Sequence, residues 1–402
     1  MNIRSEHDMD IHRYLKALVE KEGSDLFFSV GAPVTLKREG EFFAFGNQPL
    51  ANGAVKDLAW QLMSEKQIAE FEVEQEMNLA VGLPQVGRFR VNVYYQRGEV
   101  GMVIRHISHK IPAFAELGLP KQLEKLALKD RGLVLVVGAT GSGKSTTLAA
   151  MLDYRNTHRA GHIVCIEDPI EFLHKHKKAI IDQREVGLDT QSFAHALRNV
   201  LRESPDVIMI GEIRDRQTMQ HALHYSETGH LVVATLHATN SVQAVDRIVN
   251  LFPDGERKQT LGDISANLAG IIAQRLVPGT EKKRVAAVEV LLRTPYIRNL
   301  IARDELSEIK DSMNRGQEPG LQSFDQHLHE LVSAGTVSME MALRYADSPT
   351  DLKLKAKFND TRSESPLKME QPGSGAPAAE AELEFKTPST GFSDSDLTDD
   401  FR

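Results

Sequence analysis

The sequence predicts an α/β fold with a parallel sheet and helices on both of its faces, and three observations lead to it. The apolar run from Leu133 to Val137 has the composition of a strand buried on both faces. A glycine-rich loop follows it, and a helical pattern begins at Leu148. Further along the chain, strand-like and helical segments alternate, which is typical of parallel strands joined by crossover helices.

Changes in composition and pattern divide the 402 residues into five predicted parts. These are a small α+β domain at 1–107, a linker containing Pro and Gly at 108–120, the α/β core at 121–292, a helical subdomain at 293–350 and an acidic tail at 351–402. The tail is rich in Ser, Pro, Glu and Asp and poor in apolar residues, so we expect it to be disordered.

The N-terminal part should combine helices with an antiparallel sheet, because alternating apolar and polar residues occur in short runs separated by Gly and Pro. The expected helices are 9–22, 55–63 and 64–71, the last with Ser64 as its N-cap, and the expected strands are 25–30, 34–37, 41–45, 76–81, 87–96 and 99–106.

The core is expected to begin with a helix at 121–128. Further strands are predicted at 163–167, 206–211, 230–237 and 285–292, and helices at 192–202, 216–228 and throughout 241–274, with more helices up to about 347. Ligands of parallel sheets bind where the strands end, so polar residues that follow the strands are candidate site residues.

Composition narrows the class of protein. Hydrophobic residues make up 41% and charged residues 26%, and the net charge is −8, which disfavours a generally basic nucleic-acid surface. Cys165 is the single cysteine, so an internal disulfide and a four-cysteine zinc site are excluded. No apolar run approaches the roughly 20 residues of a membrane span, and the first ten residues are too polar for a secretory signal, so we expect a cytoplasmic protein without an integral membrane segment.

The loop after the first core strand has the pattern G-x-x-x-x-G-K-S of a phosphate-binding loop, or P-loop. Its glycines let the backbone amides turn inward around phosphate oxygens, and the helix that follows offers its N-terminus to the anion. Lys144 should reach the β- and γ-phosphates of ATP, and the Ser145 hydroxyl should bind Mg²⁺. The predicted nucleotide-binding residues are Gly138, Ala139, Thr140, Gly141, Ser142, Gly143, Lys144, Ser145 and Thr146.

Carboxylates follow two further strands of the predicted sheet. Glu212 follows the strand 206–211, where it should hold a water of the Mg²⁺ shell or polarise the attacking water. Glu167, Asp168 and Glu171 follow the strand 163–167, and one of them should act as base or orient the water. Spacing alone does not decide which of the three it is.

Histidines and arginines supply the remaining candidates. His230 and His237 lie at opposite ends of one predicted strand, so we expect them in different environments, with His237 sensing the γ-phosphate and His230 either functional or structural. Arginines outside the P-loop domain suit an arginine finger donated to the nucleotide of a neighbouring subunit. The candidates, in the N-terminal sheet, are Arg88, Arg90, Arg97 and Arg105.

Together these motifs resemble the secretion ATPases of the general-secretion E superfamily and, more narrowly, the type IV pilus retraction ATPases of the PilT/PilU group. The resemblance runs from about residue 8 to 346, and its most specific motif is the string from Leu201 to Asp215. It implies a RecA-like core after a PAS-like domain, a homohexamer, and work on a pilus platform protein at the inner membrane. It also implies roles for Glu171 as catalytic glutamate, Glu212 as second-motif glutamate, His237 as histidine-box residue, and Arg90 and Arg105 as trans-acting arginines.

One segment departs from the family pattern. Retraction ATPases of the PilT kind carry A-I-R-N-L-I-R-E, whereas this chain has Tyr296 to Arg303, Y-I-R-N-L-I-A-R. The change, with the acidic tail, indicates the accessory, PilU-like branch of the group, which acts beside a PilT-like paralogue. The alternatives are a RecA-like nucleic-acid translocase, which the acidic balance disfavours, another secretion-system ATPase, and a ring that binds ATP without hydrolysing it, which the complete set of site residues disfavours.

Overall fold

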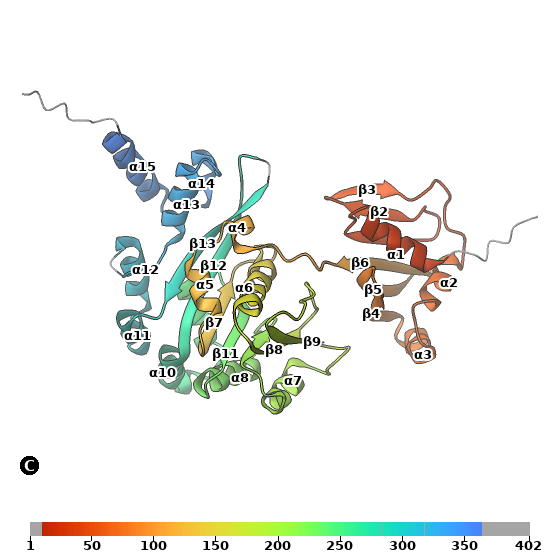
Figure 1. The fold of residues 1–402 in the computed structure, drawn as a ribbon, viewed down its shortest axis with the longest axis horizontal. Coiled ribbons are helices and arrows are strands. Elements are labelled where there is room, and N and C mark those ends of the chain that lie inside the picture. Colours follow the sequence, from red (N-terminus) through yellow and green to blue (C-terminus); the bar gives the residue numbers. More distant parts are fainter. Residues whose placement is uncertain (1–9, 282, 317, 364–402) are drawn as a thin grey trace, which may run out of the picture. The chain divides into compact units, whose positions relative to one another are not determined.

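The computed structural model describes residues 10–363 except 282 and 317. Its first sheet has the strand order β3-β2-β1-β6-β5-β4, and every neighbouring pair is antiparallel. The strands are β1 (Asp25–Phe28), β2 (Thr35–Arg38), β3 (Glu41–Ala44), β4 (Glu76–Leu83), β5 (Gly87–Gln96) and β6 (Glu99–Ile107). Helices α1 (Ile11–Glu20), α2 (Ala54–Trp60) and α3 (Glu65–Glu74) accompany it, and Ser64 caps α3 as predicted. The expected α+β architecture is confirmed (Figure 1).

The second sheet has the order β13-β12-β7-β11-β10-β8-β9 in the described part of the chain. Its strands are β7 (Gly132–Val137), β8 (Gly161–Glu167), β9 (Ala179–Glu185), β10 (Val207–Ile210), β11 (Leu231–Leu236), β12 (Leu268–Pro278) and β13 (Arg284–Leu292). All neighbouring pairs are parallel except β12 with β13, so the predicted parallel sheet carries one antiparallel edge strand. A short connection forces this exception, because parallel pairing requires a longer crossover.

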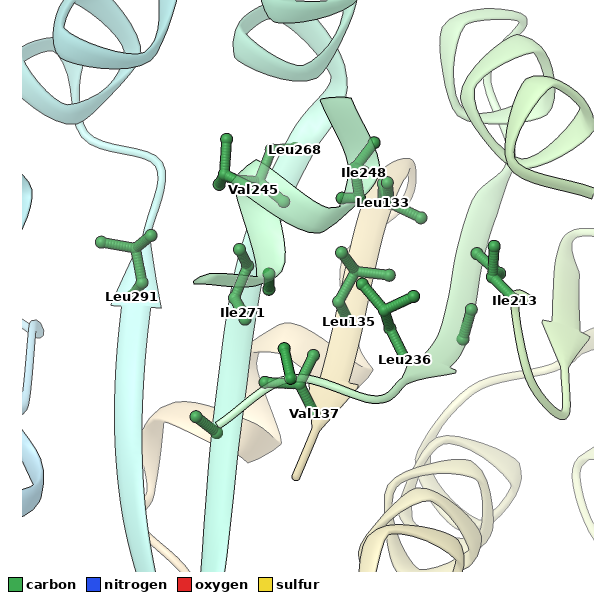
Figure 2. Packing of buried hydrophobic residues seen from close by; sticks show 14 of the residues in the cluster. Leu133, Leu135, Val137, Ile213, Leu236, Val245, Ile248, Leu268, Ile271 and Leu291 are labelled. Atoms are coloured by element: carbon green, nitrogen blue, oxygen red, sulfur yellow. The ribbon is translucent and has the colours of Figure 1, made fainter. Parts of the chain in front are cut away.

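Helices cover both faces of this sheet, as predicted. Short α4 (Phe114–Leu117), α5 (Gln122–Ala127) and α6 (Lys144–His158) pack with one set of strand residues, including Val134 and Val136. The other face receives Leu133, Leu135 and Val137 and packs with α7 (Phe193–Val200), α8 (Arg216–Glu227), α9 (Ser241–Val249) and α10 (Arg257–Asn267). Figure 2 shows part of this core, in which Val245 and Ile248 of α9 lie near Leu268 of β12 and Leu133 of β7.

The prediction of a continuous helical region at 241–274 is wrong after Asn267. Residues from Leu268 form β12, which is buried along most of its length between β7 and β13. A run of apolar residues that is buried on all sides has no clear period, so a buried strand and a buried helix read alike. Strand β9 was also not predicted, because it is an edge strand whose second half, Asp182 to Glu185, is polar, unlike the apolar run of its neighbour β8.

The C-terminal helices after β13 are α11 (Pro295–Ala302), α12 (Leu306–Arg315), α13 (Phe324–Ser333), α14 (Met339–Tyr345) and α15 (Pro349–Ser363). The expected disorder of 351–402 is wrong at its start, because α15 runs to Ser363 and buries Leu352 in the core. The rest of that tail lies outside the described residues. Among those described, none of the helices is both long and apolar enough to cross a membrane.

Candidate nucleotide-binding site

The P-loop connects the end of β7 to the start of α6. Gly141 and Gly143 adopt positive φ angles of 76° and 89°, which residues with a Cβ rarely adopt. Gly138 lies so close to β12 that an added Cβ would meet the carbonyl oxygen of Gln274 at 2.6 Å. The loop therefore packs closely against strand β12 at Gly138. Helix α6 begins directly after it, at Lys144.

The Lys144 ammonium lies over its own loop. Its Nζ atom donates to the carbonyl oxygens of Gly138 and Ala139, both at 3.0 Å. Burial lowers the pKa of Lys144, and the nearby Glu212 carboxylate acts in the opposite direction. A phosphate group would offer this cation a fully charged partner in place of two carbonyl dipoles.

Glu212 lies between two basic side chains. Its Oε1 atom is 2.9 Å from Nε2 of His237, and its Oε2 atom accepts a 2.7 Å hydrogen bond from Nε of Arg214. Arg214 also contacts Asp168, with 3.3 Å between Nη1 and Oδ2. Glu212 is only 19% exposed, so these contacts fix its carboxylate at the ends of β10 and β11.

The carboxylates at the end of β8 and just after it differ strongly in environment. Glu167 is 7% exposed and accepts a 2.8 Å hydrogen bond from Nε2 of Gln183 on β9. Burial raises its pKa to about 7, although hydrogen bonds from Gln183 and from the backbone of Glu171 act against this. Glu171 itself is exposed. Of the two glutamates, Glu171 is therefore the one accessible to a ligand.

One cavity of about 670 Å³ brings these groups together. Its walls include most of the predicted P-loop residues and all of the predicted carboxylates: Thr140, Gly141, Gly143, Lys144, Ser145, Thr146, Glu167, Asp168, Glu171, Glu212 and His237. The volume is in the range of small-molecule sites. Of the predicted loop residues, Gly138, Ala139 and Ser142 are not among those that line it.

Several residues of this wall were not predicted from the sequence: Phe172, His174, Arg214, Leu276 and Arg284. Arg214 follows Glu212 by two residues, and this spacing could have identified it as a site residue from the sequence. His174 lies on the segment between β8 and β9, where burial lowers its pKa to about 4 and therefore keeps the imidazole neutral.

The two histidines of β11 do lie in different environments. His237 contacts Glu212, whereas Nδ1 of His230 lies 3.2 Å from the carbonyl oxygen of Tyr225, at the opposite end of the strand. His230 lines a separate cavity that contains Arg155 and Asp206. It lies outside the nucleotide cavity.

Three of the candidate arginines, Arg88, Arg90 and Arg105, lie on strands of the N-terminal sheet, whereas Arg97 lies in the turn between β5 and β6. Arg90 of β5 and Arg105 of β6 are direct cross-strand partners, and Asp25 of β1 stands opposite Arg105 on its other side. The Arg105 Nε atom donates a 2.7 Å hydrogen bond to Oδ1 of Asp25. Neither arginine is among the residues that line the nucleotide cavity.

A strand, a P-loop and a helix that open into a cavity with strand-end carboxylates define a P-loop ATPase. Comparisons with known proteins agree. The family model described as "Type II/IV secretion system protein" matches residues 8–344. The type IV pilus ATPase PilU of Pseudomonas aeruginosa is 49% identical over 87% of this chain and 92% of its own length.

Two further relatives belong to the same group. The pilus retraction ATPase PilT of Pseudomonas aeruginosa is 42% identical, over 85% of this chain and 99% of its own. A crystal structure of the pilus retraction motor PilT with bound ADP has a TM-score of 0.80 and 41% identity, over 86% of this chain and all of that one. This chain therefore belongs to the type II/IV secretion system protein family and, within it, to the PilT/PilU-type pilus ATPases, which are ATP-hydrolysing, nucleotide-binding enzymes.

Proposed function

We propose that this protein is a hexameric motor that hydrolyses ATP with Mg²⁺ to power type IV pilus retraction and so twitching motility. The observation that carries the proposal is the single cavity in which Lys144, Glu171, Glu212 and His237 converge. The similarity to pilus ATPases along nearly the whole length of those relatives supports the assignment to the type IV pilus.

In the proposed reaction, Lys144 leaves the loop carbonyls and faces the β- and γ-phosphates. Glu171 orients and deprotonates the attacking water, because it is exposed to the cavity while Glu167 is buried and engaged by Gln183. His237 holds Glu212 and senses the γ-phosphate through this contact.

The residues present fit a magnesium ion. Mg²⁺ prefers oxygen ligands and keeps several waters. The Ser145 hydroxyl and the Glu212 carboxylate both line the cavity and offer such oxygens, directly or through water. When bound, the ion neutralises charge on the phosphates.

We assign the trans-acting role to Arg90 and Arg105 in a homohexamer. The two guanidinium-bearing residues stand side by side on the sheet of the N-terminal domain, 1–107, and the face that carries Arg90 is opposite to the one that buries Phe89 and Val91. A neighbouring subunit could receive both arginines at once, at the nucleotide held by its own core, 121–292.

The proposed branch is the accessory one, acting at the inner membrane beside a PilT-like paralogue and on the pilus platform protein, without nucleic acid. The divergent positions of α11 and its C-cap Arg303 support this, because Tyr296, Ala302 and Arg303 are exposed, Tyr296 to 43%. A change of shape and charge at these exposed positions alters which partner surface can dock on α11. The protein would then lie at the cytoplasmic side of the membrane as a peripheral component.

The test combines turnover and motility. We expect Lys144→Ala to lose both ADP affinity and ATP hydrolysis, and to fail to restore twitching to a strain that lacks this protein. In a strain that lacks the PilT-like paralogue, the wild-type protein should not restore retraction even when overproduced. Full-speed retraction by this protein alone would contradict the accessory role, and strong stimulation of turnover by single-stranded DNA would favour the translocase alternative.

A further inference from the structure

We infer that Gln274, on strand β12 and outside the P-loop motif, is a positioning residue that turns the Gly143 amide toward the bound phosphates. Its Nε2 atom donates a 2.8 Å hydrogen bond to the carbonyl oxygen of Ser142. Its Oε1 atom accepts a 2.6 Å hydrogen bond from the Thr147 hydroxyl. The side chain is 3% exposed and therefore lies beneath the loop, out of reach of solvent.

The orientation of the Gln274 amide follows from its partners. A backbone carbonyl can only accept, so the NH₂ group must face Ser142 and the oxygen must face the Thr147 hydroxyl, which can donate. Thr147 is itself buried, at 1% exposure, in the first turns of α6. The Ser142 carbonyl thus fixes the orientation of the amide, and the Thr147 hydroxyl holds its oxygen at the other end.

The consequence for phosphate binding follows from peptide geometry. The peptide bond between Ser142 and Gly143 is trans, since Asp168–Pro169 is the cis bond in the described residues. In a trans peptide the C=O and the N–H point in opposite directions. A donor that holds the Ser142 carbonyl toward β12 therefore directs the Gly143 N–H away from β12, and Gly143 lines the nucleotide cavity.

The loop packs closely against Gln274 at two of its glycines. A Cβ on Gly143 would meet Nε2 of Gln274 at 2.7 Å, and one on Gly138 would meet the Gln274 carbonyl oxygen at 2.6 Å. Without the amide donor, the Ser142 carbonyl would be buried without its partner or would turn toward the cavity, where it would repel a phosphate. Gln274 should therefore affect nucleotide affinity without touching the nucleotide.

The test compares Gln274→Glu and Gln274→Met with a matched control, Gln322→Glu. Gln322 is also buried, at 7% exposure, and its Nε2 atom also donates to a backbone carbonyl, that of Val288 at 3.0 Å. Affinity for ADP with Mg²⁺ is measured by titration calorimetry, and the melting temperature of the nucleotide-free protein is measured for each variant. The inference rests on the proposed role of the P-loop, so the wild-type protein must first bind ADP.

At pH 8 we expect Gln274→Glu to weaken ADP binding roughly tenfold or more, because an ionised carboxylate cannot donate to Ser142. At pH 6, protonation of this buried glutamate restores a donor, so the ratio of its affinity to that of the wild type should recover. Normalising to the wild type at each pH removes the contribution of groups that titrate in both proteins, such as Glu167. Gln274→Met should lose affinity without recovery, and Gln322→Glu should lower the melting temperature and bind ADP within twofold of the wild type.

Wild-type affinity in both Gln274 variants, or an equal loss in Gln322→Glu, would overturn the inference while leaving the nucleotide site in place. Absence of ADP binding by the wild type would instead overturn the proposed site. If Gln274→Glu does not fold, Gln274→Met alone decides, because it removes the donor without adding a charge.

Discussion

The Nε2 atom of His237 and the Oε1 atom of Glu212 lie 2.9 Å apart, and Arg214 occupies the other oxygen of the same carboxylate. Both oxygens of Glu212 are therefore engaged from within the protein. A ligand that needs this carboxylate must share it with His237 and Arg214 or displace them. The contact also connects β10 to β11 at the carboxyl ends of the strands, where the phosphates are expected.

Glu212→Gln should keep ADP binding and lose ATP turnover, by roughly a hundredfold or more if the carboxylate positions the water or the metal. Steady-state hydrolysis and calorimetry with ADP measure the two effects separately. Glu256→Gln is the control, because Glu256 pairs with Arg216 at 2.7 Å and does not line the cavity. Equal turnover in both variants would remove Glu212 from the reaction.

Arg90→Ala and Arg105→Ala should both lower turnover while ADP binding is retained, but only Arg105→Ala should destabilise the protein. Asp25 is 5% exposed and would lose the Arg105 hydrogen bond, at a cost of about 1–3 kcal/mol. Chemical denaturation and ATPase assays distinguish these effects. Parental turnover in both variants would rule out the trans-acting role.

Glu167→Gln should stabilise the nucleotide-free protein more at alkaline than at acidic pH. The pKa of Glu167 is raised from 4.5 to about 7 by burial, so the stability that its protonated form contributes is complete below about pH 4.5 and is lost as the pH rises through 7. The variant has no carboxyl group to ionise at this position, so it does not lose this stability as the pH rises. Its advantage in free energy of unfolding should grow by about 2 kcal/mol between pH 5 and pH 8, and a constant difference would contradict the buried, protonated state.

Leu352→Ala should cost about 2–5 kcal/mol of stability, because Leu352 is fully buried in the core that lines the β7 face. Leu354→Ala, two residues further along α15, is the matched control, since Leu354 is 49% exposed. Denaturant midpoints compare the two. A similar small change in both would mean that α15 does not contribute to the core.

Deletion of residues 364–402 should leave the melting temperature and the ATPase rate unchanged. This expectation comes from composition, because the few bulky apolar residues of the segment are scattered among Ser, Pro, Glu and Asp. A drop of several degrees would indicate that the segment docks on the rest of the protein.

The P-loop, Glu212 and the carboxylates after β8 could be predicted because each follows a strongly apolar strand, and parallel strands end at one edge. Gln274 could not be predicted in the same way. Its role depends on the pairing of β12 with β7, and the strand order β12-β7-β11-β10-β8 cannot be read from local sequence pattern. The Arg90–Arg105 pair likewise depends on strand register.

The helical prediction for 268–274 failed for a related reason. Local sequence indicates that a segment is apolar, but its state is decided by the neighbours that bury it, and β12 lies between β7 and β13. The start of α15 was missed because composition was averaged over a long tail, whereas one residue, Leu352, anchors that helix.

The insertion of β12 beside β7 sets an order of assembly during synthesis. The strands of the N-terminal sheet all lie within residues 25–107, so that sheet can be completed soon after it leaves the ribosome. Strand β7, by contrast, can pair with both of its neighbours only after β11 (231–236) and β12 (268–278) have been synthesised. The phosphate-binding motif is thus made about 130 residues before its supporting strand. A nascent chain that ends between residues 146 and 268 should carry the complete motif and still be unable to retain a nucleotide.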